Sequence, residues 1–221
     1  MNTAKSALLA ACFLLTARPA PADSVILGSD LSQVSHAGAG LCPSFSNCEV
    51  LAQQFTLLYP TLIDQIKVQM SGPDSLLGNP GSFSVDLENP LGTPIDSIGS
   101  GTLTYVSGNY ATQLFSFGNL NILLNPGTYY LGINGGDIGW NSAPALTTPY
   151  GTLGAEFACD PTVSHCSDPT RWGSGRSGAE RAMEIDGTAI TPEPSSWLLL
   201  GTPLLATCAA RLRRFCKLPA R

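Results

Sequence analysis

The sequence predicts an all-β protein, an antiparallel β-sandwich with a jelly-roll-like winding, and two appended terminal segments. Three observations predict this fold class. Apolar residues recur two apart in many short stretches, Gly, Pro, Asn and Asp separate these stretches, and residues 23–188 contain no helical stripe of apolar residues. Alternation with period two gives a strand one buried and one wet face. A parallel α/β fold would need helices between its strands.

The first 22 residues have the anatomy of a secretory signal peptide. Lys5 supplies an early positive charge, residues 7–15 are apolar, and small residues at Ala20-Pro21-Ala22 precede a cleavage point. We expect signal peptidase to cut after Ala22. The alternative is a buried N-terminal helix, which fits this pattern less well. A membrane span is not predicted here, because a bilayer takes about 20 apolar residues.

The sandwich domain is expected to occupy residues 23–190, with about nine short strands joined by loops rich in turn residues. The alternating apolar positions that predict strands are Ile66, Val68, Met70; Phe83, Val85, Leu87; Leu103, Tyr105; Phe115, Phe117; Leu120, Ile122, Leu124; Tyr129, Leu131, Ile133; and Met183, Ile185.

Turn residues and polar positions complete the expected domain. Asn125-Pro126-Gly127 predicts a hairpin between the stretches on either side of it. Asp86 and Glu88 fall on what reads as a solvated strand face. Residues 141–178 form the longest segment without a strand pattern, and binding sites are often built on such loops.

Four cysteines fall within the domain, in two close pairs, Cys42/Cys48 and Cys159/Cys166. Export places them in an oxidising compartment, where an even number of cysteines in close pairs predicts disulfides. Each disulfide would close one loop. The alternative is a zinc site, which would need C-x-x-C spacings and more than the two histidines of this chain.

The charge of the domain excludes one class of partner. Residues 23–191 contain 15 acidic and 4 basic side chains. Nucleic-acid phosphates require Lys and Arg, so we expect no nucleic acid among the partners. The acidity itself favours solubility.

Catalytic motifs are absent from the sequence. It contains no G-x-S-x-G elbow, no H-E-x-x-H and no EF-hand pattern. We therefore expect no catalytic residue, no metal and no cofactor. A calcium ion held by loop oxygens such as those of Asp137 or Asp160 is an alternative that no spacing singles out. A polysaccharide hydrolase with paired carboxylates is another, but an acidic domain offers many such pairs.

Three aromatic residues are candidates for ligand binding: Trp140, Tyr150 and Trp172. Exposed aromatic rings on a β scaffold stack on sugar rings, which predicts a carbohydrate-binding module. The alternative is structural. Trp140 then closes the core of the sandwich and Trp172 packs under its loop.

The tail, residues 191–221, is predicted to contain a transmembrane helix. Every side chain from Ser195 to Ala210 is apolar or small. This run gives about 24 Å of helix, and its flanks extend it toward the roughly 30 Å hydrocarbon core. Trp197 stands where an interfacial aromatic residue belongs.

Both flanks of the apolar run support this prediction. Pro192 and Pro194 prevent a helix from running in from the domain. Beyond the run, Arg211, Arg213 and Arg214 mark the cytoplasmic side by the positive-inside rule. The domain would then lie outside the cytoplasm.

The tail resembles the PEP-CTERM sorting signal of exported bacterial proteins. The resemblance rests on Pro192-Glu193-Pro194, then SSWLLLGTPLLATCAA, then RLRR. It implies recognition by an exosortase, removal of the helix, and transfer to the cell surface, the outer membrane or the extracellular matrix. The domain is more loosely similar to β-sandwich ectodomains of such proteins, through AQQFTLLYPTLIDQIKVQMSG and LNILLNPGTYYLGING.

The sequence thus predicts an exported protein, anchored in the inner membrane before processing, with a structural or adhesive role and no catalysis. Its expected partners are signal peptidase, exosortase and the membrane. Exopolysaccharide joins them under the first alternative, a carbohydrate-binding module. The second alternative is a polysaccharide hydrolase.

Overall fold

The structure is a computed structural model of the 221-residue chain. It describes residues 24–41, 50–72, 81–103, 112–135, 138–159, 166–174 and 180–191, and for residues 36–41 and 174 it describes the backbone alone. The chain divides into two units, Met1–Ala189 and Ile190–Arg221. All the described strands lie in the first unit. Of the second unit, only Ile190 and Thr191 are described.

The first unit is all-β, as predicted. Its described strands are β1 (Ser24–Gly28), β2 (Ser35–Leu41), β3 (Val50–Leu57), β4 (Thr61–Ser71), β5 (Gly81–Glu88), β6 (Pro94–Leu103), β7 (Thr112–Leu124), β8 (Gly127–Gly135), β9 (Ile138–Ser142), β10 (Gly151–Cys159), β11 (Gly173–Ser174) and β12 (Met183–Ala189). One 3₁₀ turn, η1 (Pro169–Arg171), precedes β11.

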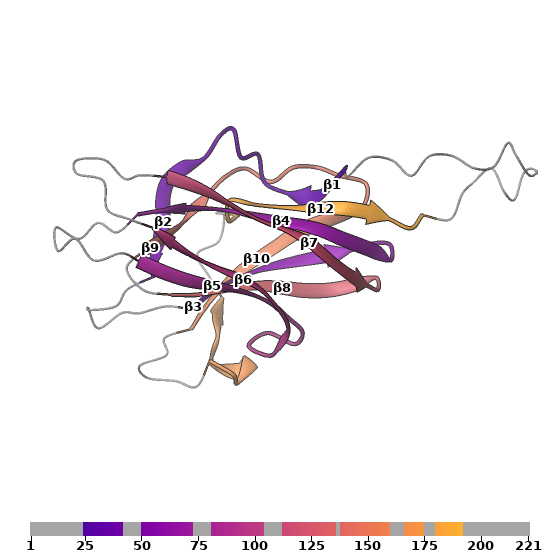
Figure 1. Ribbon diagram of the computed structural model, residues 1–221. Coiled ribbons are helices and arrows are strands. Elements are labelled where there is room, and N and C mark those ends of the chain that lie inside the picture. The colour runs from indigo at the N-terminus through magenta and orange to yellow at the C-terminus, as the bar shows by residue number, and fades with distance from the viewer. Residues whose placement is uncertain are drawn as a thin grey trace, which may run out of the picture. The chain divides into compact units, whose positions relative to one another are not determined.

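The strands form two antiparallel sheets, as a β-sandwich requires (Figure 1). The first sheet has the order β1-β12-β4-β9-β2, and β7 pairs with the other side of β4. The second sheet has the order β11-β10-β3-β8-β5-β6. Apolar side chains from both sheets, among them Phe55, Ile66 and Trp140, form one core cluster.

The clearest alternating stretches lie where the sequence places them. Ile66, Val68 and Met70 of β4 are fully buried, and the residues between them are half-buried. The same holds for the inward positions of β5 and β8. Each inward side chain removes apolar surface from water, and full burial contributes about 1.5–3 kcal/mol per side chain.

The predicted hairpin at Asn125-Pro126-Gly127 is wrong. β7 pairs with β4 in the first sheet, whereas β8 pairs with β3 and β5 in the second sheet. The turn therefore crosses between the sheets as a β-arch. Residues 58–60 make the same crossing between β3 and β4. The two arches lie side by side, because β3 pairs with β8 and β4 pairs with β7.

The expectation that residues 141–178 lack strands is also wrong. β10 lies within this range and pairs with β3 over most of its length. Two features obscure the alternation of apolar residues in β10. The register shifts between Leu153 and Glu156, and Glu156 is buried although it is charged. A bulge of this kind interrupts the period-two signal.

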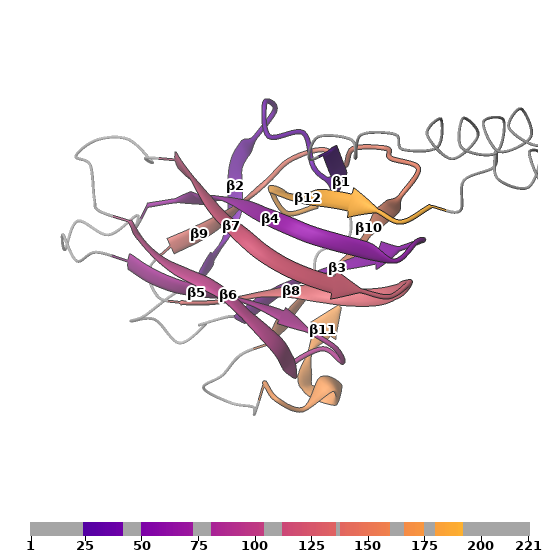
Figure 2. The same cartoon turned by 45° about the vertical axis from the view of Figure 1, so that its right-hand side comes forward.

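Two edge strands, β6 and β7, lie near each other on one side of the sandwich (Figure 2). Glycines of β6 leave room there for aromatic rings. A Cβ atom on Gly101 would lie 2.6 Å from the ring of Phe83 and 2.7 Å from the ring of Phe115, and those two rings meet edge to face at 4.8 Å. The rings thus close the core between the two edges.

No helix among the described residues is long and apolar enough to cross a membrane. The predicted span, from Ser195 to Ala210, lies outside the described residues, as does the predicted signal peptide, residues 1–22.

Candidate functional site

Trp140 lies in the core of the sandwich. Its side chain is 0% exposed, and its Nε1 donates a hydrogen bond to the carbonyl oxygen of Ala182 at 3.2 Å. β9 places it between the sheets, where it packs with residues of the main core cluster. The ring has no face open to a sugar, so the structural alternative applies to this residue.

Trp172 packs on the outer face of the second sheet. It belongs to a second apolar cluster with Val50, Ala52, Leu91 and Cys159, and it is 8% exposed. Its Nε1 donates to the carbonyl oxygen of Cys166 at 2.8 Å. Trp172 therefore packs under its loop, as in the structural alternative.

A disulfide between Cys159 and Cys166 holds this region together, as predicted. It ties the end of β10 to the segment that leads into η1. Asp168 caps η1, because its Oδ1 accepts hydrogen bonds from the backbone and hydroxyl of Thr170. The other predicted pair, Cys42 and Cys48, lies outside the described residues.

Tyr150 is half-buried and packs against the main core cluster. It precedes β10 and accepts a backbone hydrogen bond from Leu58. Trp140, Tyr150 and Trp172 thus pack in different surroundings, two against the main core and one in the second cluster. The structure does not gather these three residues into one site.

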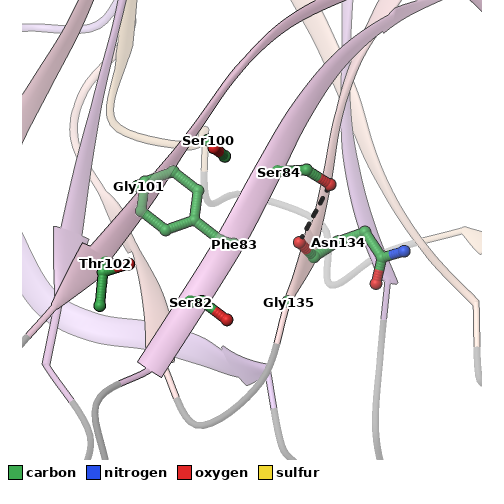
Figure 3. A pocket seen from close by; sticks show the side chains of 8 residues that line it. All are labelled: Ser82, Phe83, Ser84, Ser100, Gly101, Thr102, Asn134 and Gly135. Carbon is green, nitrogen blue, oxygen red and sulfur yellow. Dashed lines mark hydrogen bonds between the residues drawn. The ribbon is translucent and has the colours of Figure 1, made fainter.

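A shallow, open depression of about 400 Å³ lies on the outer face of the second sheet (Figure 3). Strands β5, β6 and β8 form it. Its lining residues are Ser82, Phe83, Ser84, Ser100, Gly101, Thr102, Asn134 and Gly135.

The strand register sets the polar groups of this depression in two rows. Ser82 pairs with Thr102, and Ser84 lies between Ser100 on one side and Asn134 on the other. The Oγ of Ser84 donates to the carbonyl oxygen of Asn134 at 3.4 Å. Figure 3 shows the Phe83 ring directed toward Gly101, and it contributes to the core rather than to the polar rows.

The chemistry of this lining is neutral hydrogen bonding. Hydroxyl groups donate and accept, and the amide of Asn134 does both. None of the eight lining residues is an acid, a base or a histidine, so the lining contains no general base to activate a hydroxyl. Such a surface suits an uncharged polyhydroxylated ligand. The sequence carried a signal for it, since Ser82 and Ser84 alternate with Phe83 and Val85.

The sequence predicts that Glu88 is solvated, but the structure buries it. It is 6% exposed at the end of β5, and its Oε2 accepts a hydrogen bond from the backbone of Gly92 at 2.7 Å. Burial raises the pKa of Glu88; the bond from Gly92 opposes this rise, and the charge of Asp86 adds to it. The carboxyl group holds the β5–β6 turn beside the second apolar cluster, since a Cβ on Gly92 would lie 2.9 Å from Nε1 of Trp172.

A buried ion pair joins the two sheets. Arg181, next to β12, contacts Glu156 of β10 through its Nη2, and both side chains are 3% exposed. Nη1 of Arg181 also donates to the carbonyl oxygen of Trp140 at 2.9 Å. The backbone of Arg181 donates to Oε1 of Gln53 at 3.0 Å. These contacts link β10, β9 and β3 around Arg181, which is typical of a structural pair.

Within the described part of the chain, no group of three or more His, Cys, Asp or Glu side chains is placed to hold a metal ion. Asp137 and Asp160 lie outside it. The sorting residues Pro192, Glu193 and Pro194, the membrane residues Ser195, Trp197 and Ala210, and the cations Arg211, Arg213 and Arg214 also lie outside it.

Comparisons with family models, curated proteins and solved structures found no match to this chain.

Proposed function

We propose that the protein is an exported component of the cell surface or extracellular matrix, with a structural or adhesive role and no catalysis. One observation carries this proposal. The last strand of an all-β unit, β12, leads through Ile190 and Thr191 directly into the Pro-Glu-Pro step, the apolar run and the arginine cluster of the tail. A folded domain followed at once by such a segment is typical of a surface protein held by its C-terminal end.

The proposal includes the finer description of the fold. The sandwich is jelly-roll-like, because arches rather than hairpins link its sheets at β3–β4 and β7–β8. A signal peptide precedes it, and a single transmembrane helix follows it. Exosortase then recognises Pro192-Glu193-Pro194 and removes the helix. The protein passes from the inner membrane to the surface, the outer membrane or the matrix.

Mass spectrometry of the protein isolated from cell envelopes tests this proposal. The expected mature chain begins at Asp23 and lacks the apolar run together with Arg221. A chain that still carries Arg221 would contradict processing and leave a plain membrane anchor. A chain that still begins at Met1 would contradict export by a cleaved signal peptide.

Binding of a neutral polysaccharide is a second candidate function, and the hydroxyl-lined depression favours it. Exopolysaccharide presents many hydroxyl groups and no obligatory charge, which matches the polar rows around Ser84. The proposed carbohydrate contact therefore lies at the depression and not at Trp140 or Trp172.

Retention on immobilised exopolysaccharide tests the second candidate. Asn134→Ala combined with Thr102→Val removes exposed hydrogen-bonding groups from both rows, and we expect at least tenfold weaker retention. Thr152→Val is the matched control, since Thr152 is exposed on β10 and does not line the depression. Equal retention of all three proteins would refute binding at the depression.

A further inference from the structure

Among the described residues, one end of the sandwich carries no charged side chain, although the domain as a whole is acidic. We call it the arch end, and it comprises residues 24, 55–63, 122–129, 150–153 and 187–189. The strand register brings these segments together. Thr61 pairs with both Leu124 and Ala189, and Leu57 pairs with both Gly127 and Gly151.

Large apolar side chains are exposed at the arch end. Leu123 is 61% exposed and Leu58 is 54% exposed, and Tyr59 beside Leu58 is half-buried. Exposed apolar residues that cluster on one uncharged surface mark an interaction site.

The chain itself indicates what covers this surface. β12 ends at Ala189, at the arch end (Figures 1 and 2). Residues 191–194 separate Ile190 from the apolar run, and four extended residues span at most about 14 Å. If that run crosses a bilayer, the tether keeps the arch end close to the membrane surface.

The distribution of charge determines which part of the domain can lie close to the membrane surface. The described acidic residues that border the arch end are Asp64 and Asp186, and both lie outside the segments that form it. Lys67 forms an ion pair with Asp186 at 2.7 Å, which partly neutralises that carboxylate. An uncharged surface with two exposed Leu side chains and a half-buried Tyr suits the boundary between head groups and acyl chains, where amphipathic aromatic rings are enriched.

We propose that the arch end is a membrane-contact surface: before processing, Leu58, Tyr59 and Leu123 insert into the interfacial region of the lipid bilayer. This inference rests on the proposed membrane span of the tail. It adds that the domain is held in one orientation. The arch end then faces the membrane, and the hydroxyl-lined depression, at the other end of β8, faces the exterior.

Depth measurements on the full chain in liposomes of neutral phospholipid test the proposal. Leu123→Trp places a fluorescent probe at the arch end. Leu114→Trp is the matched control, because Leu114 is a 47% exposed leucine of the same strand, roughly 25 Å farther along β7. Lipids that carry bromine on the acyl chain close to the head group quench only those tryptophans that enter the bilayer.

We expect bromolipid to quench the fluorescence that Leu123→Trp adds to the wild-type signal, with a shift to shorter wavelength. The fluorescence added by Leu114→Trp should remain unquenched. Leu58→Glu combined with Leu123→Trp should lose at least half of the quenching, because a carboxylate then faces the bilayer.

Trp197 separates the failure of this inference from the failure of the proposed span. If bromolipid quenches wild-type fluorescence through Trp197 but spares Leu123→Trp, the tail is inserted and the membrane-contact surface is refuted. If wild-type fluorescence is not quenched at all, the span fails and the inference fails with it. A blue shift of Leu123→Trp in detergent that grows with protein concentration would assign the surface to a second copy of the chain and overturn the lipid contact.

Discussion

Glu88 shows how a single position can depart from its sequence pattern. Asp86 and Glu88 alternate with apolar residues of β5, and this alternation predicts a solvated face. The outer face of the second sheet is instead covered near Glu88 by Leu91 and Trp172. Trp172 lies far along the chain from Glu88, so no local pattern contains the cover that it provides.

Substitution of Glu88 by Gln should change the pH dependence of stability. The pKa of Glu88 is raised in the folded protein, so the folded state binds a proton more tightly than the unfolded state does. Its contribution to stability is present below the unfolded pKa and is lost as the pH rises through the folded pKa. We expect Glu88→Gln to gain stability relative to the wild type as the pH rises from 4 to 7.

Urea unfolding at a series of pH values measures this difference. Asp30→Asn is an informative control, because hydrogen bonds from the side chain and backbone of Ser32 lower the pKa of Asp30. Its relative stability should change in the opposite direction, with the wild type losing its advantage as the pH falls. A pH-independent difference for Glu88→Gln would contradict the assignment.

The ion pair of Arg181 and Glu156 gives a second prediction at this scale. Glu156→Gln should destabilise the fold by roughly 3–5 kcal/mol, because it leaves the buried guanidinium without a counter-charge. Glu156→Leu combined with Arg181→Met should cost less than Glu156→Gln, since it removes both charges. Urea unfolding of Glu156→Gln, of the double variant and of its two single variants, Glu156→Leu and Arg181→Met, measures these changes, and additive losses of the two single variants in the double variant would contradict the coupling of the pair.

At the scale of elements, the glycines of β6 allow two edge strands to close the core. Gly101→Ala should destabilise the protein by about 1–3 kcal/mol, because its Cβ would press on the rings of Phe83 and Phe115. Phe115→Leu in the same chain should recover part of this loss by removing one of the rings. Thermal unfolding measures both effects.

Gly173→Ala is the matched control for this prediction. A Cβ there would lie 3.8 Å from its nearest neighbour, the carbonyl oxygen of Ala158, which is an ordinary contact. We therefore expect a change in stability of less than about 0.5 kcal/mol. Equal losses for Gly101→Ala and Gly173→Ala would show that backbone freedom, and not the aromatic rings, sets the cost.

The sequence predicts strands well where one face is buried and the other is wet. β4, β5 and β8 meet that condition. β3 and β10 do not, because Gln53 and Glu156 point inward and have their partners around Arg181. Polar residues at inward positions break the alternation, and the group that pairs with them lies 25 or more residues away.

Neither the arches nor the candidate site could be predicted from the sequence, because both depend on how strands that are distant in the sequence pair. Asn125-Pro126-Gly127 predicts a turn, but whether a turn makes a hairpin or an arch depends on which partner each flanking strand finds. The depression needs the register of β5, β6 and β8, which brings Ser84 beside Ser100 and Asn134. The disulfide of Cys159 and Cys166 needed only local spacing, and it was predicted.

For the whole molecule, β1 joins the start of the described chain to its last strand. Ile26 and Leu27 are 0% and 1% exposed, and β1 pairs with β12. A chain that begins at Ser29 should therefore lose roughly 3–6 kcal/mol of stability, the sum for two buried side chains. A chain that begins at Asp23, as cleavage after Ala22 would leave it, should keep full stability.

Denaturant unfolding of the two purified chains compares their midpoints. The difference between the two midpoints measures how much β1, which the predicted cleavage leaves intact, stabilises the sandwich. If the chain that begins at Ser29 unfolds at the same midpoint, then β12 does not depend on β1, and the first sheet tolerates the loss of its outermost strand.

The position of β12 between two partner strands has a mechanical consequence. β12 lies between β1 and β4, and its C-terminal residue is the point at which the proposed anchor pulls. When an adhesive load acts on the far side of the domain, the force runs along β12 and shears both of its ladders together. Antiparallel hydrogen bonds lie across the strand direction, so the two ladders share the load instead of opening one bond at a time. The proposed anchor thus pulls on a strand that is hydrogen-bonded along both of its edges.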